Sequence, residues 1–183
     1  MRVIAGSARS LLLVAPTGLG TRPTTDRIKE TLFNMIQPHL YGCNFLDLFS
    51  GSGAIGIEAL SRGASHATFI EKDTEAINCI NRNLQHTKLY DKSTILPLDY
   101  QLALERLNKD GKQFDIIFVD PPYDKLIESQ VLEFLSKSNI VHENTLIIVE
   151  ARVGTQFDYV EKYGFHITHI KDYKTNIHVF LKK

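Results

Sequence analysis

The sequence lacks the features that mark membrane and secreted proteins. No stretch approaches the roughly 20 apolar residues that span a bilayer, and the N-terminus has no long apolar segment followed by a small-residue cleavage site. The only two cysteines, Cys43 and Cys79, form no CxxC pair, so we interpret them as reduced core residues. Low-complexity tracts and internal repeats are also absent. A chain of 183 residues with this composition is expected to be cytoplasmic.

The chain also lacks a net charge, which at first argues against a nucleic-acid partner. The distribution of charge is more informative. Residues 1–40 carry five basic and two acidic side chains, residues 41–150 carry ten and sixteen, and residues 151–183 carry six and three. Two basic ends therefore flank an acidic middle, and an anionic partner would meet the ends. An ordinary solvated surface is the alternative interpretation.

Short apolar runs alternate with segments of helical periodicity from residue 44 onward, which is typical of a parallel sheet covered by helices. The pattern predicts strands at 44–49, 67–71, 93–98, 114–119 and 145–150, and helices at 53–62, 74–86, 100–108, 125–137 and 154–162. Alternating runs at 165–170 and 177–181 predict an antiparallel hairpin at the sheet edge. The expected fold class is α/β: a Rossmann-like, mainly parallel, seven-stranded sheet with helices on both faces.

Residues 1–40 have a different character. Residues 1–5 and 11–15 are predicted to pair as a small hairpin, and a helix follows. The apolar face of this helix is formed by Ile28, Leu32, Met35 and Ile36. Because no long linker is present, we predict one domain over residues 1–183, with an N-terminal extension at 1–40 and the core at 41–183.

A glycine-rich loop joins the first core strand to its helix. The loop consists of Phe49, Ser50, Gly51, Ser52 and Gly53, and Gly56 completes a GxGxxG pattern. Such loops let the backbone approach a ligand, but the pattern alone does not separate a dinucleotide from another adenosine cofactor. Asp47, just before the loop, favours S-adenosylmethionine, because a carboxylate there would repel a pyrophosphate and attract an ammonium group. An NAD-binding oxidoreductase is the alternative.

Further polar residues follow the strands. Glu71, with Lys72 beside it, is predicted to accept hydrogen bonds from the cofactor ribose, and Asp99 to bind the adenine amino group. Thr24 and Thr25 are candidates to present helix N–H groups to the cofactor carboxylate. Helix N-capping is the alternative role for all of these except Lys72.

The tetrapeptide Asp120, Pro121, Pro122 and Tyr123 ends the apolar run at 114–119. Proline fixes φ and has no N–H, so this stiff segment offers acceptors only. Acceptors beside an aromatic ring suit a flat group that carries an amine, such as a nucleobase. A proline-rich turn after a core strand is the alternative.

These motifs, in this order, resemble those of class I methyltransferases that modify amino groups. The chain looks most like the RsmD family of 16S ribosomal RNA (guanine-N2)-methyltransferases, above all at residues 1–4, 22–34, 46–63 and 119–123. The segment 22–34 is the most particular to this family. The sequence departs from the family pattern at Ala5, at Ser10–Leu12, which lacks the usual basic residues, and around Lys174.

The resemblance implies methyl transfer from S-adenosylmethionine to the N2 amine of one guanine of 16S rRNA, in the small ribosomal subunit or an assembly intermediate. Asp120 and the Pro121 carbonyl would accept the amine protons, and Tyr123 would stack on a flipped base. Our candidates for RNA phosphate contacts are Arg2, Arg9, Arg22 and Arg27, with surface ion pairs as the alternative.

Two other functions stay open: an adenine-N6 DNA or RNA methyltransferase, and a non-catalytic RNA-binding assembly factor with this fold. We expect a monomer with no membrane partner. We also expect no metal site, because His166 and His169 should face opposite sides of a strand.

Overall fold

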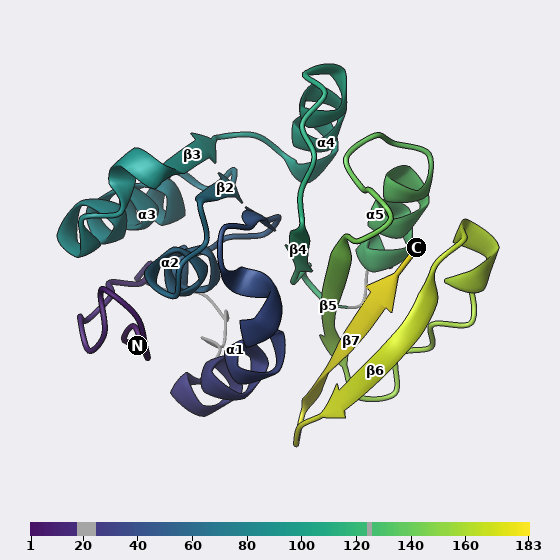
Figure 1. Ribbon diagram of the computed structural model, residues 1–183, viewed down its shortest axis with the longest axis horizontal. Helices are drawn as coiled ribbons and strands as arrows, with labels where there is room; N and C mark the ends of the chain where they lie inside the picture. Colours follow the sequence, from purple (N-terminus) through teal and green to yellow (C-terminus); the bar gives the residue numbers. More distant parts are fainter. Residues whose placement is uncertain (18–24, 124–125) are drawn as a thin grey trace.

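A seven-stranded mixed sheet forms the centre of the protein. The computed structural model describes residues 1–17, 25–123 and 126–183. The strands are β1 (Asn44–Asp47), β2 (His66–Ile70), β3 (Ser93–Leu96), β4 (Ile116–Val119), β5 (Leu146–Arg152), β6 (His166–Asp172) and β7 (Asn176–Lys182). Their order is β3-β2-β1-β4-β5-β7-β6 (Figure 1). The first five in this order are parallel, β7 is antiparallel to β5, and β6 is antiparallel to β7. The predicted sheet with its C-terminal hairpin is confirmed.

Helices cover both faces of this sheet. They are α1 (Asp26–Leu40), α2 (Ala54–Ser61), α3 (Thr74–Thr87), α4 (Tyr100–Lys109) and α5 (Ile127–Ser136), with a short 3₁₀ helix η1 (Tyr90–Lys92) before β3. Alternate residues of β4 belong to two hydrophobic clusters. Ile116 and Phe118 pack with residues of α1, α2 and α3, and Ile117 and Val119 pack with residues of α4 and α5. None of the helices in the described part of the chain is long and apolar enough to cross a membrane.

The segment between β5 and β6 does not form the helix predicted at 154–162. Only the 3₁₀ helix η2 (Glu161–Tyr163) forms there, after a series of turns. Gly154 has a φ of +90°, in the left-handed region, which an α-helix does not accept. Phe157 and Val160 are buried and anchor the segment on the α4–α5 side of the sheet. Two apolar anchors three residues apart imitate helical periodicity without a helix.

β6 contains an irregularity that changes the direction of its side chains. The register shifts between Ile167 and His169, so His166 pairs with Lys182 while His169 pairs with Phe180. Residues 180 and 182 share one face of β7, and their partners therefore share a face as well. Our prediction that His166 and His169 point to opposite sides is wrong. Among the described residues, no group of three or more His, Cys, Asp or Glu side chains is placed to hold a metal ion.

The N-terminal segment folds back on itself before it meets the core. Arg2 and Leu12 form an antiparallel bridge, which confirms the predicted pairing of residues 1–5 with 11–15. Gly6 has a φ of +86°, and a Cβ there would lie 1.8 Å from the Ser61 carbonyl oxygen. This position therefore requires glycine, whereas the departure from the family pattern falls on the residue before it.

A buried ion cluster then joins this segment to α1 and α2. Glu58 of α2 is fully buried, and its carboxylate accepts hydrogen bonds from the N–H groups of Ile4 (2.8 Å) and Ala5 (3.0 Å). Lys29 Nζ lies 3.2 Å from Glu58 Oε2, and Arg62 Nε lies 2.8 Å from Glu58 Oε1. We call Lys29, Glu58 and Arg62 the Glu58 cluster. Two cations and two amides satisfy one carboxylate in the interior.

Candidate functional site

Four acidic side chains lie at or just after the carboxyl ends of four adjacent strands: Asp47 of β1, Glu71 after β2, Asp120 after β4 and Glu150 in β5. The sheet order β2-β1-β4-β5 brings these strands together. Ligands of open α/β sheets bind at this edge, in the crevice outside the carboxyl ends of the strands. We call these four residues the sheet-end carboxylates.

The glycine loop between β1 and α2 is built to bring backbone close to a ligand. Gly51 and Gly53 have φ values of +52° and +77°, and Gly53 is the N-cap of α2. Ser50 closes the turn, because its hydroxyl donates to the Asp47 carbonyl (2.8 Å) and its carbonyl accepts from Gly53 N (2.7 Å). A Cβ at Gly56 would lie 2.4 Å from the Phe69 ring, so this glycine lets α2 pack against β2.

Two residues complete the surroundings of this loop. The Ser52 carbonyl accepts a hydrogen bond from Asn83 Nδ2 (2.9 Å), which ties the loop to α3. The Phe49 ring lies 5.3 Å from the Tyr100 ring at the start of α4. Both contacts fix the loop from neighbouring elements, while the role of its residues in cofactor binding stays a prediction.

Asp47 is a buried acid under the loop. It is 1% exposed, and its Oδ2 accepts a hydrogen bond from Gly56 N (3.0 Å). Burial and, to a smaller extent, the negative charge of Glu71 raise the pKa of the Asp47 carboxyl to about 7, although the hydrogen bond from the Gly56 amide lowers it. A cation beside this carboxyl would return it to its ionised form.

Glu71 binds the glycine loop directly. Its Oε2 accepts from Gly51 N (2.8 Å), and its Oε1 accepts from the N–H groups of Lys72 (2.8 Å) and Asp73 (2.9 Å). The N-cap of α3 is Asp73, which accepts from Ala76 N, so the capping alternative for Glu71 is wrong. A carboxylate has about four acceptor positions, which leaves capacity for a ligand hydroxyl.

Asp99 and Thr25 both take the alternative role that the sequence left open. Asp99 caps α4 by accepting from Gln101 N (3.2 Å), and it also pairs with Lys72 Nζ at 2.9 Å. The hydrogen bond from Lys72 lowers the pKa of the Asp99 carboxyl. Thr25 caps α1 by accepting from Ile28 N (3.3 Å). Capping does not preclude a further contact with a ligand.

Thr24 and Arg22 lie outside the described residues. Of the other predicted RNA contacts, Arg2 forms an exposed ion pair with Asp26 at 3.1 Å, whereas Arg9 and Arg27 have exposed side chains. The alternative of a surface ion pair therefore applies to Arg2.

The Asp120 tetrapeptide leaves β4 beside the other carboxylates. Burial raises the pKa of the Asp120 carboxyl well above its usual value, and the charges of Glu150 and Asp47 raise it further. Pro121 is buried. Tyr123 is 39% exposed as a residue, while its hydroxyl donates to Glu150 Oε1 at 3.2 Å.

The sequence analysis missed Glu150 and the residues that hold it. Glu150 is buried, and its Oε1 accepts from Asn176 Nδ2 (2.7 Å) in addition to Tyr123. Its Oε2 lies 3.0 Å from Nε2 of His178, a fully buried histidine of β7. A signal was available, because an acid follows the apolar run Leu146–Val149 just as Asp120 follows the run that ends at Val119.

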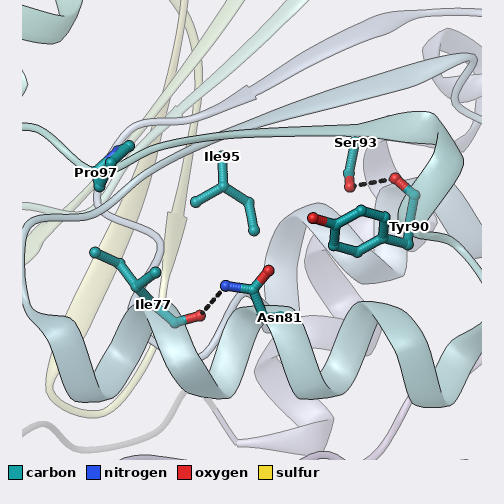
Figure 2. Close-up of a pocket in the computed structure, with 6 residues that line it drawn as sticks. All are labelled: Ile77, Asn81, Tyr90, Ser93, Ile95 and Pro97. Atoms are coloured by element: carbon teal, nitrogen blue, oxygen red, sulfur yellow. Dashed lines mark hydrogen bonds between the residues drawn. The ribbon is translucent and has the colours of Figure 1, made fainter.

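A separate groove lies between α3 and β3 (Figure 2). It is lined by Ile77, Asn81, Tyr90, Ser93, Ile95 and Pro97. Asn81 Nδ2 donates to the Ile77 carbonyl (3.0 Å), and Ser93 Oγ donates to the Tyr90 carbonyl (2.6 Å). The groove contains none of the predicted site residues, and these hydrogen bonds serve the fold itself.

Comparison with known proteins indicates the class of this protein. The solved structure described as "Putative methyltransferase yhhF from Escherichia coli" superposes with a TM-score of 0.87 and 32% identity, over 100% of this chain and 97% of that chain. The "Ribosomal RNA small subunit methyltransferase D" of Haemophilus influenzae is 37% identical over 82% of this chain and 78% of its own length. The fold and the site define a class I methyltransferase.

The family follows from a second comparison. The model of the family described as "Conserved hypothetical protein 95" matches residues 1–181, and the chain belongs to this family. The "Putative rRNA methyltransferase YlbH" of Bacillus subtilis is 41% identical over 82% of this chain and 82% of its own length. The resemblance to the RsmD family is confirmed.

Proposed function

We propose that the chain transfers a methyl group from S-adenosylmethionine to the N2 amine of a guanine in 16S rRNA. The observation that carries this proposal is the set of sheet-end carboxylates around a glycine loop. Burial and neighbouring carboxylates raise the pKa values of Asp47 and Asp120. The site therefore stabilises a cationic ligand better than a neutral or anionic one. A pyrophosphate-bearing dinucleotide fits these charges poorly.

The residues present fit this cofactor. Asp47 would face the ammonium group of the cofactor, and Glu71 would accept from its ribose hydroxyls. The backbone of the glycine loop would pack against the cofactor; this loop consists of Phe49, Ser50, Gly51, Ser52 and Gly53. Asp99, which pairs with Lys72, would bind the adenine amino group, and Thr24 and Thr25 remain candidates to present helix N–H groups to the cofactor carboxylate. When bound, the sulfonium supplies an electrophilic methyl group and a neutral thioether as leaving group.

Asp120 and Pro121 would act on the amine of the target base. The nitrogen lone pair of guanine N2 is delocalised into the ring, which makes it a weak nucleophile. Two acceptors, the Asp120 carboxylate and the Pro121 carbonyl, would bind both N–H groups and direct the lone pair toward the methyl carbon. Holding both reactants in line can supply a large part of the roughly 7–11 kcal/mol that good intramolecular geometry provides.

In this mechanism Asp120 acts in its ionised form. Positive charge develops on the amine nitrogen as the new N–C bond forms, and an ionised Asp120 stabilises that charge. The neighbouring carboxylates hold its pKa high in the free chain, and a cation in the site opposes them. The methylated amine then becomes acidic and releases its proton late, to Asp120 or to water.

The proposed RNA partner rests on the relatives and on the distribution of charge. Relatives named as methyltransferases of the small-subunit ribosomal RNA cover most of this chain. Arg9 and Arg27 are exposed on the N-terminal part, where they could meet phosphates. Such an enzyme would act in the cytoplasm, as a monomer, on the small subunit or its assembly intermediate.

Replacing Asp120 tests the proposal. Asp120→Ala should reduce the transfer of labelled methyl groups to small-subunit RNA by about 100-fold or more, as loss of a transition-state contact does. Its affinity for S-adenosylhomocysteine, measured by calorimetry, should stay close to that of the unaltered chain. Asp110→Ala, which removes an exposed acid at the end of α4, is the matched control.

Mass spectrometry of the product identifies the modified atom. N2-methylguanosine supports the proposal, whereas N6-methyladenosine would establish the other amino-methyltransferase. Full activity of Asp120→Ala would contradict the role of Asp120, and failure of the unaltered chain to bind S-adenosylhomocysteine would contradict the proposal as a whole.

A further inference from the structure

The Tyr123 ring is exposed, but its hydroxyl is anchored. The residue is 39% exposed, and its hydroxyl donates to Glu150 Oε1 at 3.2 Å. A ring that stacks on a base must present its face in a fixed orientation. We propose that Glu150 is a positioning residue that fixes the Tyr123 ring for stacking on the target base. This inference rests on the proposed function and deepens it.

β5 contacts the tyrosine at two points. Glu150 and Arg152 are two residues apart on this strand, so their side chains project from the same face. Glu150 binds the hydroxyl of Tyr123, and Arg152 Cζ lies 5.7 Å from the ring centroid, over its face. One strand thus sets both the end and one face of the ring. An incoming base would pack on the opposite face.

Glu150 is itself held from β7. Asn176 Nδ2 donates to Glu150 Oε1 (2.7 Å), and His178 Nε2 lies 3.0 Å from Oε2. His178 stands directly opposite Glu150 in the antiparallel register, and its Nδ1 lies 3.3 Å from the Tyr173 hydroxyl. A carboxylate fixed on both oxygens cannot change rotamer freely, and it therefore fixes its third partner, Tyr123.

Charge gives Glu150 a second, separable effect. The groups that face it are Tyr123, Asn176, His178 and Asp120, with Arg152 over the ring and Tyr173 behind the histidine. The negative charge of Glu150 is one cause of the raised pKa of Asp120. Removing that charge lowers this pKa, so the acid limb of the activity profile moves to lower pH. A purely structural role would not move it.

A double-mutant cycle tests the positioning role. Tyr123→Phe removes the hydroxyl and keeps the ring, and Glu150→Gln removes the charge and keeps the shape. Each should lower kcat for RNA methylation roughly tenfold on the high-pH plateau, the cost of losing or weakening a hydrogen bond to a charged group. In the Tyr123→Phe background, Glu150→Gln should change kcat little, because the hydroxyl on which it acts is gone. The shift of the acid limb should persist in both backgrounds.

The control removes a hydroxyl elsewhere. Tyr163→Phe removes the hydroxyl that lies 3.4 Å from Ser129 Oγ and keeps the ring. This variant should keep both kcat and the pH profile. All variants should retain a single cooperative thermal unfolding transition and the affinity for S-adenosylhomocysteine.

Each outcome of the cycle decides the inference. If the two kcat losses multiply, Glu150 does not act through Tyr123, and the inference fails while the proposed function stands. Full activity of Tyr123→Phe has the same meaning. If the unaltered chain methylates no RNA at all, the proposed function fails, and this inference fails with it.

Discussion

The protein has buried carboxylates in two places, and the charges around them differ. In the Glu58 cluster, one carboxylate meets two cations and two backbone amides. Among the sheet-end carboxylates, Asp47 accepts from an amide, and Glu150 bonds with a phenol, an amide and an imidazole. Their charges also raise the pKa of Asp120.

The difference separates a group that stabilises the fold from a group prepared for a ligand. A buried charge that is fully compensated holds two parts of the chain together, although it adds little net free energy. The raised pKa values of Asp47 and Asp120 mean that ionising these two acids costs free energy, which a bound cation can offset. The Glu58 cluster therefore joins the N-terminal segment to α1 and α2, whereas the sheet-end carboxylates are the groups that we propose for the cofactor and the target amine.

Breaking the Glu58 cluster should have the largest effect on stability. Lys29→Met leaves Glu58 with one cation fewer in the interior, and we expect the free energy of unfolding to fall by about 3–5 kcal/mol. Urea denaturation measures this loss. Lys137→Met is the matched control, because Lys137 pairs with Glu133 while its side chain is 72% exposed, and it should cost under about 1 kcal/mol. An equally small loss for Lys29→Met would show that Arg62 and the amides suffice.

At Asp47, by contrast, the ionised carboxyl is expected to destabilise the fold. Its carboxyl has a pKa of about 7 in the folded chain, above the value of about 3.9 in the unfolded chain. Its protonated form therefore stabilises the fold fully below about pH 4, and this contribution is lost as the pH rises to about 7. Asp47→Asn should remove a dependence of roughly 2–4 kcal/mol over that window and should weaken cofactor binding.

Thermal or urea denaturation between pH 4 and 8 checks this expectation, with Asp110→Asn as the exposed control. A stability profile of Asp47→Asn that parallels that of the unaltered chain would show that ionisation of Asp47 does not oppose folding.

A smaller effect is expected at Glu71. Glu71→Gln keeps the size of the side chain but removes a charged acceptor, so the affinity for S-adenosylhomocysteine should fall by about 1–3 kcal/mol. Titration calorimetry measures the change. Glu75→Gln, an exposed acid bonded to Thr17, should leave the affinity unaltered. Equal affinities for the two variants would limit Glu71 to its contacts with the backbone amides of Gly51, Lys72 and Asp73.

The strand ends were predictable from the sequence because two local signals coincide there. A buried apolar run gives the strand, and the acid that follows gives its carboxyl end, as at Asp47 and Asp120. The role of Lys29 was not predictable in this way. Lysine is seldom fully buried, and its partner Glu58 lies 29 residues further along the chain, so only the fold brings them together.

Long-range packing also explains the failed predictions. The segment before β6 has helix-like spacing, but Phe157 and Val160 are drawn to the core separately. Likewise, one extra residue in β6 reverses the expected direction of His169, and a period-two pattern contains no sign of it.

The extra residue in β6 also affects the exposed edge of the sheet. β6 is an outer strand with mostly exposed side chains, and its unpaired amides and carbonyls could recruit a strand from a neighbouring molecule. The bulge twists the row of free groups, and Lys171 places a charge along it. Both features disfavour the addition of a strand from a second molecule to this edge of the sheet.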